Sequence, residues 1–125
     1  MAFEVEVKTI TVTAGASGVT QGYTVVRNSS GTYDVAGTNY VLVDGIAQET
    51  AAAGVAFQMA VPNGAFVKAA AGGTITDGDL VQTNNAGKIV THTGAGFNLG
   101  RAVGAAVSGD TMTIEFFISG AATAS

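Results

Sequence analysis

The stretch Gly78–Ile118, GDLVQTNNAGKIVTHTGAGFNLGRAVGAAVSGDTMTIEFFI, alternates short apolar runs with clusters of Gly, Asn and Asp. Such clusters favour tight turns, because glycine accepts positive φ angles and Asn or Asp side chains bond to the local backbone. The stretch therefore predicts four short strands separated by turns. They begin near Leu80, around Ile89, at Gly100 and after Asp110.

The same alternation of short apolar runs with glycine-containing turns occurs earlier, between Gly22 and Met59. Four glycines of the earlier segment match four of the later one with one residue of slippage: Gly22, Gly31, Gly45 and Gly54 against Gly78, Gly87, Gly100 and Gly109. Other residues match in turn position or strand phase: Asn28 with Asn84, and Phe57, Met59 and Val61 with Met112, Ile114 and Phe116. Two interpretations stay open. One is a structural duplication with halves at about 22–61 and 78–118, and the other is the chance similarity of any glycine-punctuated β protein.

Elsewhere, runs of four to seven β-branched or aromatic residues recur with turns every eight to twelve residues. No segment keeps a helical apolar period over ten residues, so the pattern is typical of an all-β protein. We expect a compact small β-barrel or sandwich (β-tulip-like) with at most one short helix. Further strands are expected at 23–27, 33–43, 55–61 and 65–70. The segment 46–53, IAQETAAA, fits either a short helical turn or a strand plus turn.

The N-terminal residues change apolar phase. One face carries Phe3, Val5 and Val7, and after a one-residue shift the other carries Ile10 and Val12. Such a shift moves the apolar set to the opposite side of a strand. Two interpretations follow: a strand of the domain with a bulge near Lys8-Thr9, or an extended arm, 1–13, whose two parts pack on different surfaces.

The length of 125 residues is typical of one domain, expected at 14–120 with a flexible tail at 121–125. Only 11% of residues are Asp, Glu, Lys or Arg, against about 25% in a typical soluble domain. Either a Thr, Ser, Asn and Gly surface replaces the charges, or an assembly buries much of the exterior; the second is favoured. Without cysteine, neither a disulfide nor a thiolate site can form.

The net charge of −4 and five scattered basic residues argue against nucleic-acid binding, which needs clustered Lys and Arg. No apolar run approaches the roughly 18 residues of a membrane helix. Glu4 and Glu6 lie where a signal peptide carries positive charge. We therefore expect no direct contact with nucleic acid or membrane, and no standard export signal.

Candidate chemical groups are few. His92 lies in a Thr-rich strand, and no recognisable nucleophile accompanies it. Asp77 and Asp79 flank a glycine in a turn, where an aspartate more often caps the backbone than binds a cation. The glycines of 94–100 resemble a dinucleotide fingerprint but have the wrong spacing and no following helix. We expect no enzyme, no cofactor and no metal site.

Several glycine-containing motifs together resemble the small capsid decoration proteins (cement or head-stabilising proteins) of tailed bacteriophages, across about 17–118. They are Gly45-Ile46-Ala47, Gly64-Ala65-Phe66, Gly78-Asp79-Leu80-Val81, Gly87-Lys88-Ile89-Val90, Gly100-Arg101-Ala102 and Gly109-Asp110 through Phe116. Some members of this family carry a recombinase label. This chain has no phosphate-binding loop for ATP-driven recombination, so we reject that function.

The resemblance implies a non-catalytic virion protein, made in the host cytoplasm and bound to the outer capsid surface. It implies a homotrimer that clamps neighbouring major capsid proteins near local three-fold axes. From the N-terminal pattern we add an expected capsid-binding set, which acts by strand addition: Phe3, Val5, Val7, Ile10 and Val12. The alternative function is a non-catalytic binding module, such as a carbohydrate-binding or fibre- or tail-associated β domain with polar loops.

Overall fold

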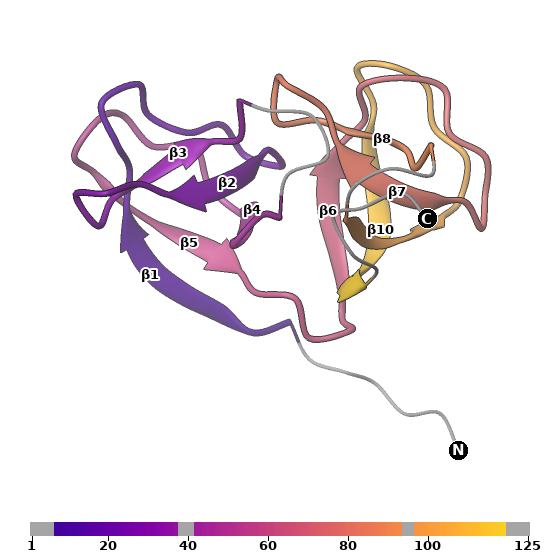
Figure 1. Cartoon of the computed structure of the whole chain (residues 1–125), viewed down its shortest axis with the longest axis horizontal. Helices are drawn as coiled ribbons and strands as arrows, with labels where there is room; N and C mark the ends of the chain where they lie inside the picture. Colours follow the sequence, from indigo (N-terminus) through magenta and orange to yellow (C-terminus); the bar gives the residue numbers. More distant parts are fainter. Residues whose placement is uncertain (1–6, 38–41, 94–96, 120–125) are drawn as a thin grey trace.

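The computed structural model describes residues 7–37, 42–93 and 97–119, which contain ten strands and no helix (Figure 1). The strands are β1 (Thr9–Thr13), β2 (Thr24–Arg27), β3 (Tyr33–Val35), β4 (Gly45–Ala47), β5 (Ala56–Ala60), β6 (Phe66–Ala70), β7 (Leu80–Thr83), β8 (Ile89–Thr91), β9 (Asn98–Val103) and β10 (Thr111–Ser119). The segment 46–53 is strand β4 followed by a turn region, so its helical alternative is wrong. Within the described ranges, no helix has the length and apolar character needed to span a membrane.

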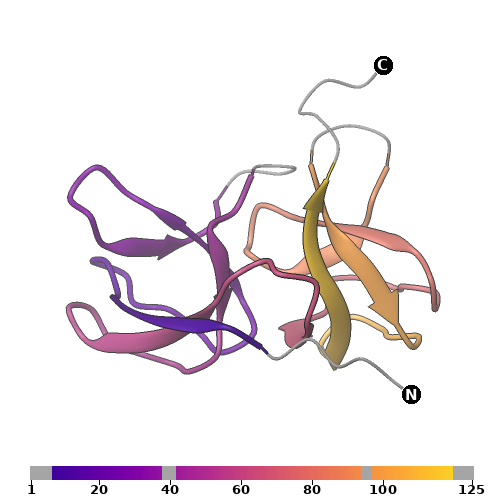
Figure 2. The same cartoon turned by 90° about the horizontal axis from the view of Figure 1, so that it is seen from below.

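The strands form two antiparallel sheets of five strands, ordered β1-β5-β4-β2-β3 and β6-β10-β9-β7-β8. Adding five to each strand number of the first order gives the second. The repeated strand order is what the duplication interpretation predicts, with β1–β5 as the first half and β6–β10 as the second. Both halves begin earlier than the expected bounds 22–61 and 78–118, at Thr9 and Phe66. The halves lie side by side (Figures 1 and 2). Neither sheet closes on itself, which confirms the all-β class and fits the sandwich rather than the barrel.

The duplication extends to single hydrogen bonds. The amide oxygens of Asn28 and Asn84 each accept the backbone N–H groups two and four residues later, at 2.9 and 3.1 Å after Asn28 and at 2.9 and 3.0 Å after Asn84. These side chains close the β2–β3 and β7–β8 turns, because an amide oxygen replaces a backbone acceptor there. The isolated bridges are duplicated as well: Val19 with Ala51, and Ile75 with Ala106.

One aligned pair of glycines lies inside strands and is required for close backbone approach. Gly100 in β9 has a φ of +143°, and a Cβ atom there would collide with the carbonyl oxygen of Glu115 in β10. At the equivalent Gly45, a Cβ atom would press on Met59 and on the carbonyl oxygen of Ala60. The β4–β5 and β9–β10 pairs therefore depend on glycine at these positions.

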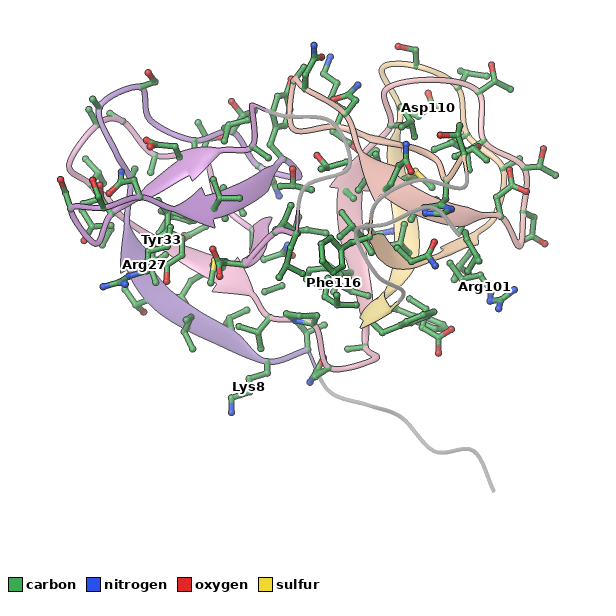
Figure 3. All side chains as sticks on the ribbon, in the orientation of Figure 1. Lys8, Arg27, Tyr33, Arg101, Asp110 and Phe116 are labelled. Atoms are coloured by element: carbon green, nitrogen blue, oxygen red, sulfur yellow. The ribbon has the colours of Figure 1, made fainter. Side chains whose placement is uncertain are left out.

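The core consists of two apolar clusters, a smaller one within the first half and a larger one that joins residues of both halves. In the first half, Phe57 and Met59 of β5 are buried in a cluster with residues from its loops and β2. In the second half, the aligned residues of β10, Met112, Ile114 and Phe116, are buried in the larger cluster. Figure 3 shows Phe116 between the two halves. The matched strand phase predicted from the sequence is confirmed by this burial.

The two halves meet through a polar contact embedded in the larger core. The hydroxyl oxygens of Thr24 and Thr83 lie 2.7 Å apart, and both residues are fully buried. Thr83 donates its proton to the carbonyl oxygen of Asn84 at 3.0 Å, so Thr24 is the donor within the pair. Backbone bonds join the halves on either side: Thr24 N–H to Gly87 O at 2.8 Å, and Ala70 N–H to Gly22 O at 2.9 Å.

The N-terminal strand is regular where the structure describes it. The register of β1 against β5 runs without interruption from Thr9 to Thr13, and the N–H of Val61 donates to the carbonyl oxygen of Lys8 at 2.9 Å, which continues the same register. The bulge predicted near Lys8-Thr9 is therefore wrong for these residues. The expected strand 33–43 is shorter than predicted, because β3 ends at Val35; residues 38–41 lie outside the described ranges.

Replacing Gly100 with alanine should lower the free energy of unfolding by at least about 2 kcal/mol, because the new methyl group must displace the β10 backbone. Urea denaturation would measure the change. Gly37→Ala is the matched control, since Gly37 has no positive φ and no atom near its Cβ position, and it should change stability by less than about 0.5 kcal/mol. Equal stabilities of the two variants would contradict the close approach.

The Thr24–Thr83 contact is testable by a double-mutant cycle. Thr24→Val and Thr83→Val should each destabilise by about 1–2 kcal/mol, because the first removes the hydrogen bond donated to Thr83 and the second leaves the buried Thr24 hydroxyl without an acceptor. The double variant should cost about 1 kcal/mol less than the sum, since removing both hydroxyls removes the unpaired group. Strictly additive free energies of unfolding would show that the two hydroxyls do not depend on each other.

Candidate functional site

The two turn aspartates hold loop backbone. An oxygen of Asp77 accepts the N–H of Gly104 at 2.8 Å. An oxygen of Asp79 accepts the N–H of Thr76 at 3.0 Å and the hydroxyl of Thr91 at 3.2 Å. These contacts fit the predicted capping role, in which the carboxylate replaces a backbone acceptor. No group of three or more His, Cys, Asp or Glu side chains that could hold a metal ion occurs in the described part of the chain.

The remaining polar candidates are also part of the β framework. His92 directly follows β8, is half-buried, and donates its backbone N–H to the carbonyl oxygen of Leu80 at 2.8 Å. Of the glycine-rich segment, 94–96 lies outside the described residues, while Leu99 and Gly100 belong to strand β9. A strand at this point lacks the helix N-terminus that binds a pyrophosphate in the dinucleotide fingerprint.

The structure separates the predicted capsid-binding residues. Phe3 and Val5 lie outside the described residues. Val7 and Ile10 are on the surface, with 44% and 38% of their area exposed. Val12 is partly buried and packs against the core of the first half. Val7 and Ile10 are therefore available for a partner, whereas Val12 contributes to the fold.

Strand β1 is the edge of the first sheet, and half of its backbone faces outward. Lys8 and Ala14 exchange hydrogen bonds with the β5 side, through Val61 N–H to Lys8 O and Ala14 N–H to Val55 O, both at 2.9 Å. Because bonding direction alternates along an antiparallel strand, the N–H and C=O groups of Thr9, Thr11 and Thr13 point away from β5. At the end of the strand Ala14 bridges Tyr33 of β3, so the open part of the edge is formed by Thr9 and Thr11. A row of this kind is a template for an added strand. In Figure 1, β1 runs along the lower border of the first half.

A second exposed surface, on the outer face of the second sheet, was not expected from the sequence. Directly opposed residues cross the strands β7, β9, β10 and β6 in one row, the second-sheet row: Leu80, Arg101, Glu115 and Phe66. Phe66 is 59% exposed and Leu80 37%, and Val103 in the neighbouring row is 40% exposed. Figure 3 shows Arg101 at the end of the molecule away from the first half. This face combines large apolar side chains with a central pair of opposite charges.

A signal for this face was present in the sequence. In 65–70, Ala65, Val67 and Ala69 alternate with Phe66 and Lys68, and the structure buries the first set and exposes the second. Sequence alternation identified the strand but could not assign the larger Phe66 to the exposed side. The cross-strand neighbours depend on pairings between distant segments, which no local pattern contains.

Comparison with known proteins identifies relatives. The family model described as phage cement protein matches residues 5–118. A solved structure, the N base of the head fiber gp8.5 of bacteriophage phi29, superimposes with a TM-score of 0.69 at 20% sequence identity and covers 87% of this chain and 94% of that chain. At this identity the likeness shows a shared fold alone. No curated protein matches the chain. Because the family model spans nearly the whole chain, the protein belongs to the phage cement protein family and is a capsid-associated structural protein.

Proposed function

We propose that the protein binds the outer surface of an icosahedral phage capsid as a homotrimer and stabilises contacts between major capsid proteins. The observation that carries this proposal is the open edge of β1, with Val7 and Ile10 exposed beside its outward backbone groups. The N-terminal segment 1–13 is the attachment element, and a strand of the major capsid protein pairs with it. Family membership supports a structural role on the virion.

Pairing with an added strand explains how the edge of β1, which carries few charged side chains, can bind a capsid protein. Each new backbone hydrogen bond contributes about 0.5–1.5 kcal/mol net, and burial of an exposed valine or isoleucine adds about 1.5–3 kcal/mol at most. Thr9 and Thr11, with Val7 and Ile10, therefore support a modest affinity for a single copy. Many copies on one lattice, each with several attachment edges in its trimer, raise the total strength through multivalency.

The low charge content favours a protein that is bound in an assembly over one that stays free in solution. Long charged side chains are costly to remove from water unless each finds a partner. The exposed polar side chains of β1 are the uncharged Thr9 and Thr11, which lose less hydration than charged side chains when a partner strand lies beside them. The function requires no chemical step, and the carboxylates of Asp77 and Asp79 are already engaged by the backbone.

Blocking the edge should abolish attachment without unfolding the protein. Thr11→Pro removes one outward N–H and keeps the ladder to β5, because that N–H does not face β5. We expect at least about a tenfold loss in affinity for empty expanded shells of the parental phage that lack this protein, which corresponds to about 1.4 kcal/mol. Co-sedimentation of labelled protein with the shells would measure it.

Thr11→Ala is the matched control, since it removes the same side chain but retains the N–H, and its affinity should stay close to that of the wild type. Thermal unfolding of both variants shows whether the first sheet is intact. Wild-type decoration by a folded Thr11→Pro protein would exclude strand addition at β1. Retained binding by both variants, together with full release by Val7→Ser, would place attachment in the side chains alone.

A further inference from the structure

Equivalent faces of the two halves differ in how far they are exposed to solvent. In the first sheet, opposed residues of β2, β4, β5 and β1 form the first-sheet row, which is the counterpart of the second-sheet row: Thr24, Ile46, Ala60 and Thr9. Three of its four members, all except Thr9, are fully buried. In the second-sheet row, both Leu80 and Phe66 are exposed. One face is therefore covered in the first half and bare in the second.

The cover over the first-sheet row is the second half itself. Thr83 binds the hydroxyl of Thr24, Gly87 accepts the N–H of Thr24, and the N–H of Ala70 donates to Gly22. Ile46 and Ala60 belong to the same apolar cluster as the core of the second half. Lys88 adds a cation over the Tyr23 ring, 5.7 Å from its centroid. The cover thus comes from the β7–β8 turn and the end of β6.

The duplication identifies the counterpart of this cover in the first half. By the aligned strand registers and turns, Ala70, Thr83 and Gly87 correspond to residues that we call the end surface: Thr13, Arg27 and Gly31. In Figure 3, Arg27 and the nearby Tyr33 lie at one end of the molecule, and Arg101 of the second-sheet row lies at the other. The covering surface and the covered surface are different, so the two halves are arranged head to tail.

We propose that the second-sheet row binds a second copy of this chain through the end surface of that copy. The contact repeats between chains the head-to-tail arrangement that already exists between the two halves within one chain. Such a contact is heterologous, and it forms a closed ring when the rotation between copies closes. The inference deepens the homotrimer of the proposed function by naming its two contact surfaces, and it is independent of how the capsid is bound.

The chemistry of the two surfaces supports this pairing. The second-sheet row and its neighbour present three large apolar side chains on one face, Phe66, Leu80 and Val103, which a partner would remove from water. Glu115 places a carboxylate in the middle of the second-sheet row, and the end surface supplies the exposed side chain of Arg27 as a charge of opposite sign. Arg101 donates to the carbonyl oxygen of Gly78 at 3.2 Å, so one of its N–H groups already has a local partner.

The end surface also offers a backbone N–H donor, which matches a carbonyl acceptor beside the second-sheet row. In the internal contact, the outward N–H of Ala70 in β6 donates to the carbonyl oxygen of Gly22. The equivalent outward N–H belongs to Thr13 in β1. The equivalent acceptor is the carbonyl oxygen of Gly78 beside the second-sheet row, which accepts one hydrogen bond from Arg101 and has a second lone pair for the N–H of another copy. One backbone hydrogen bond between copies would thus reproduce the one between the halves, and it fixes the relative orientation of the chains.

The test uses the full chain in solution without shells, with one variant for each surface. Phe66→Ser/Leu80→Ser alters only exposed side chains of the second-sheet row, and Arg27→Glu reverses the charge on the end surface. Sedimentation velocity should give the wild type the mass of a ring of three. Each variant alone should fall to the monomer, about threefold lower in mass, because every copy then lacks one of its two surfaces.

Mixing the two variants gives the decisive result. Each retains the surface that the other lacks, so an equimolar mixture should form a heterodimer, about twice the monomer mass, and no ring. Val107→Ser, which alters an exposed valine outside both surfaces, should keep the wild-type mass. A monomeric wild type, a wild-type mass in either variant, or a mixture that stays monomeric would overturn the proposal. Because shells are absent, these outcomes are separate from loss of attachment by Thr11→Pro.

Discussion

The structure depends on the burial of one face of the first sheet beneath the second half. Thr24, Ile46 and Ala60 have no exposed surface, and the apolar members share a cluster with the core of β6–β10. A five-stranded sheet of short strands has little core of its own, and an open apolar face against water would be costly. Joining the halves closes that face, and the Thr24–Thr83 hydroxyl pair sets their relative position within the contact.

The repeated topology shows how one fold unit can present two different surfaces. The turn asparagines, the strand order and the loop bridges are the same in both halves, so the backbone framework is retained. The residues on the equivalent outer rows differ, with Ile46 fully buried under the cover in one half and Arg101 exposed at the equivalent position in the other. Because these positions do not determine the strands, they are free to change from an internal contact to an external one.

Membership of the phage cement family gives these surfaces a context. A protein that adds to an existing shell needs contacts that are repeated on every copy and geometrically precise, and backbone edges and flat sheet faces provide both. The chain has few charges to desolvate, and its turn aspartates accept hydrogen bonds from backbone N–H groups. A rigid framework with bare edges is what such a role requires, whereas a reacting site would need convergent polar side chains.

The sequence by itself determined the all-β class, the turns at Asn28 and Asn84, and the aligned glycines, since these follow from local backbone preferences and from the two-residue period of strands. It also predicted the matched burial of β5 and β10. It could not decide whether 46–53 is helix or strand, because short apolar runs fit both. Only the tertiary structure placed Ile46 inside and Arg101 outside at equivalent positions. That choice depends on which face another segment covers, and the pairing of distant segments is not contained in any local pattern.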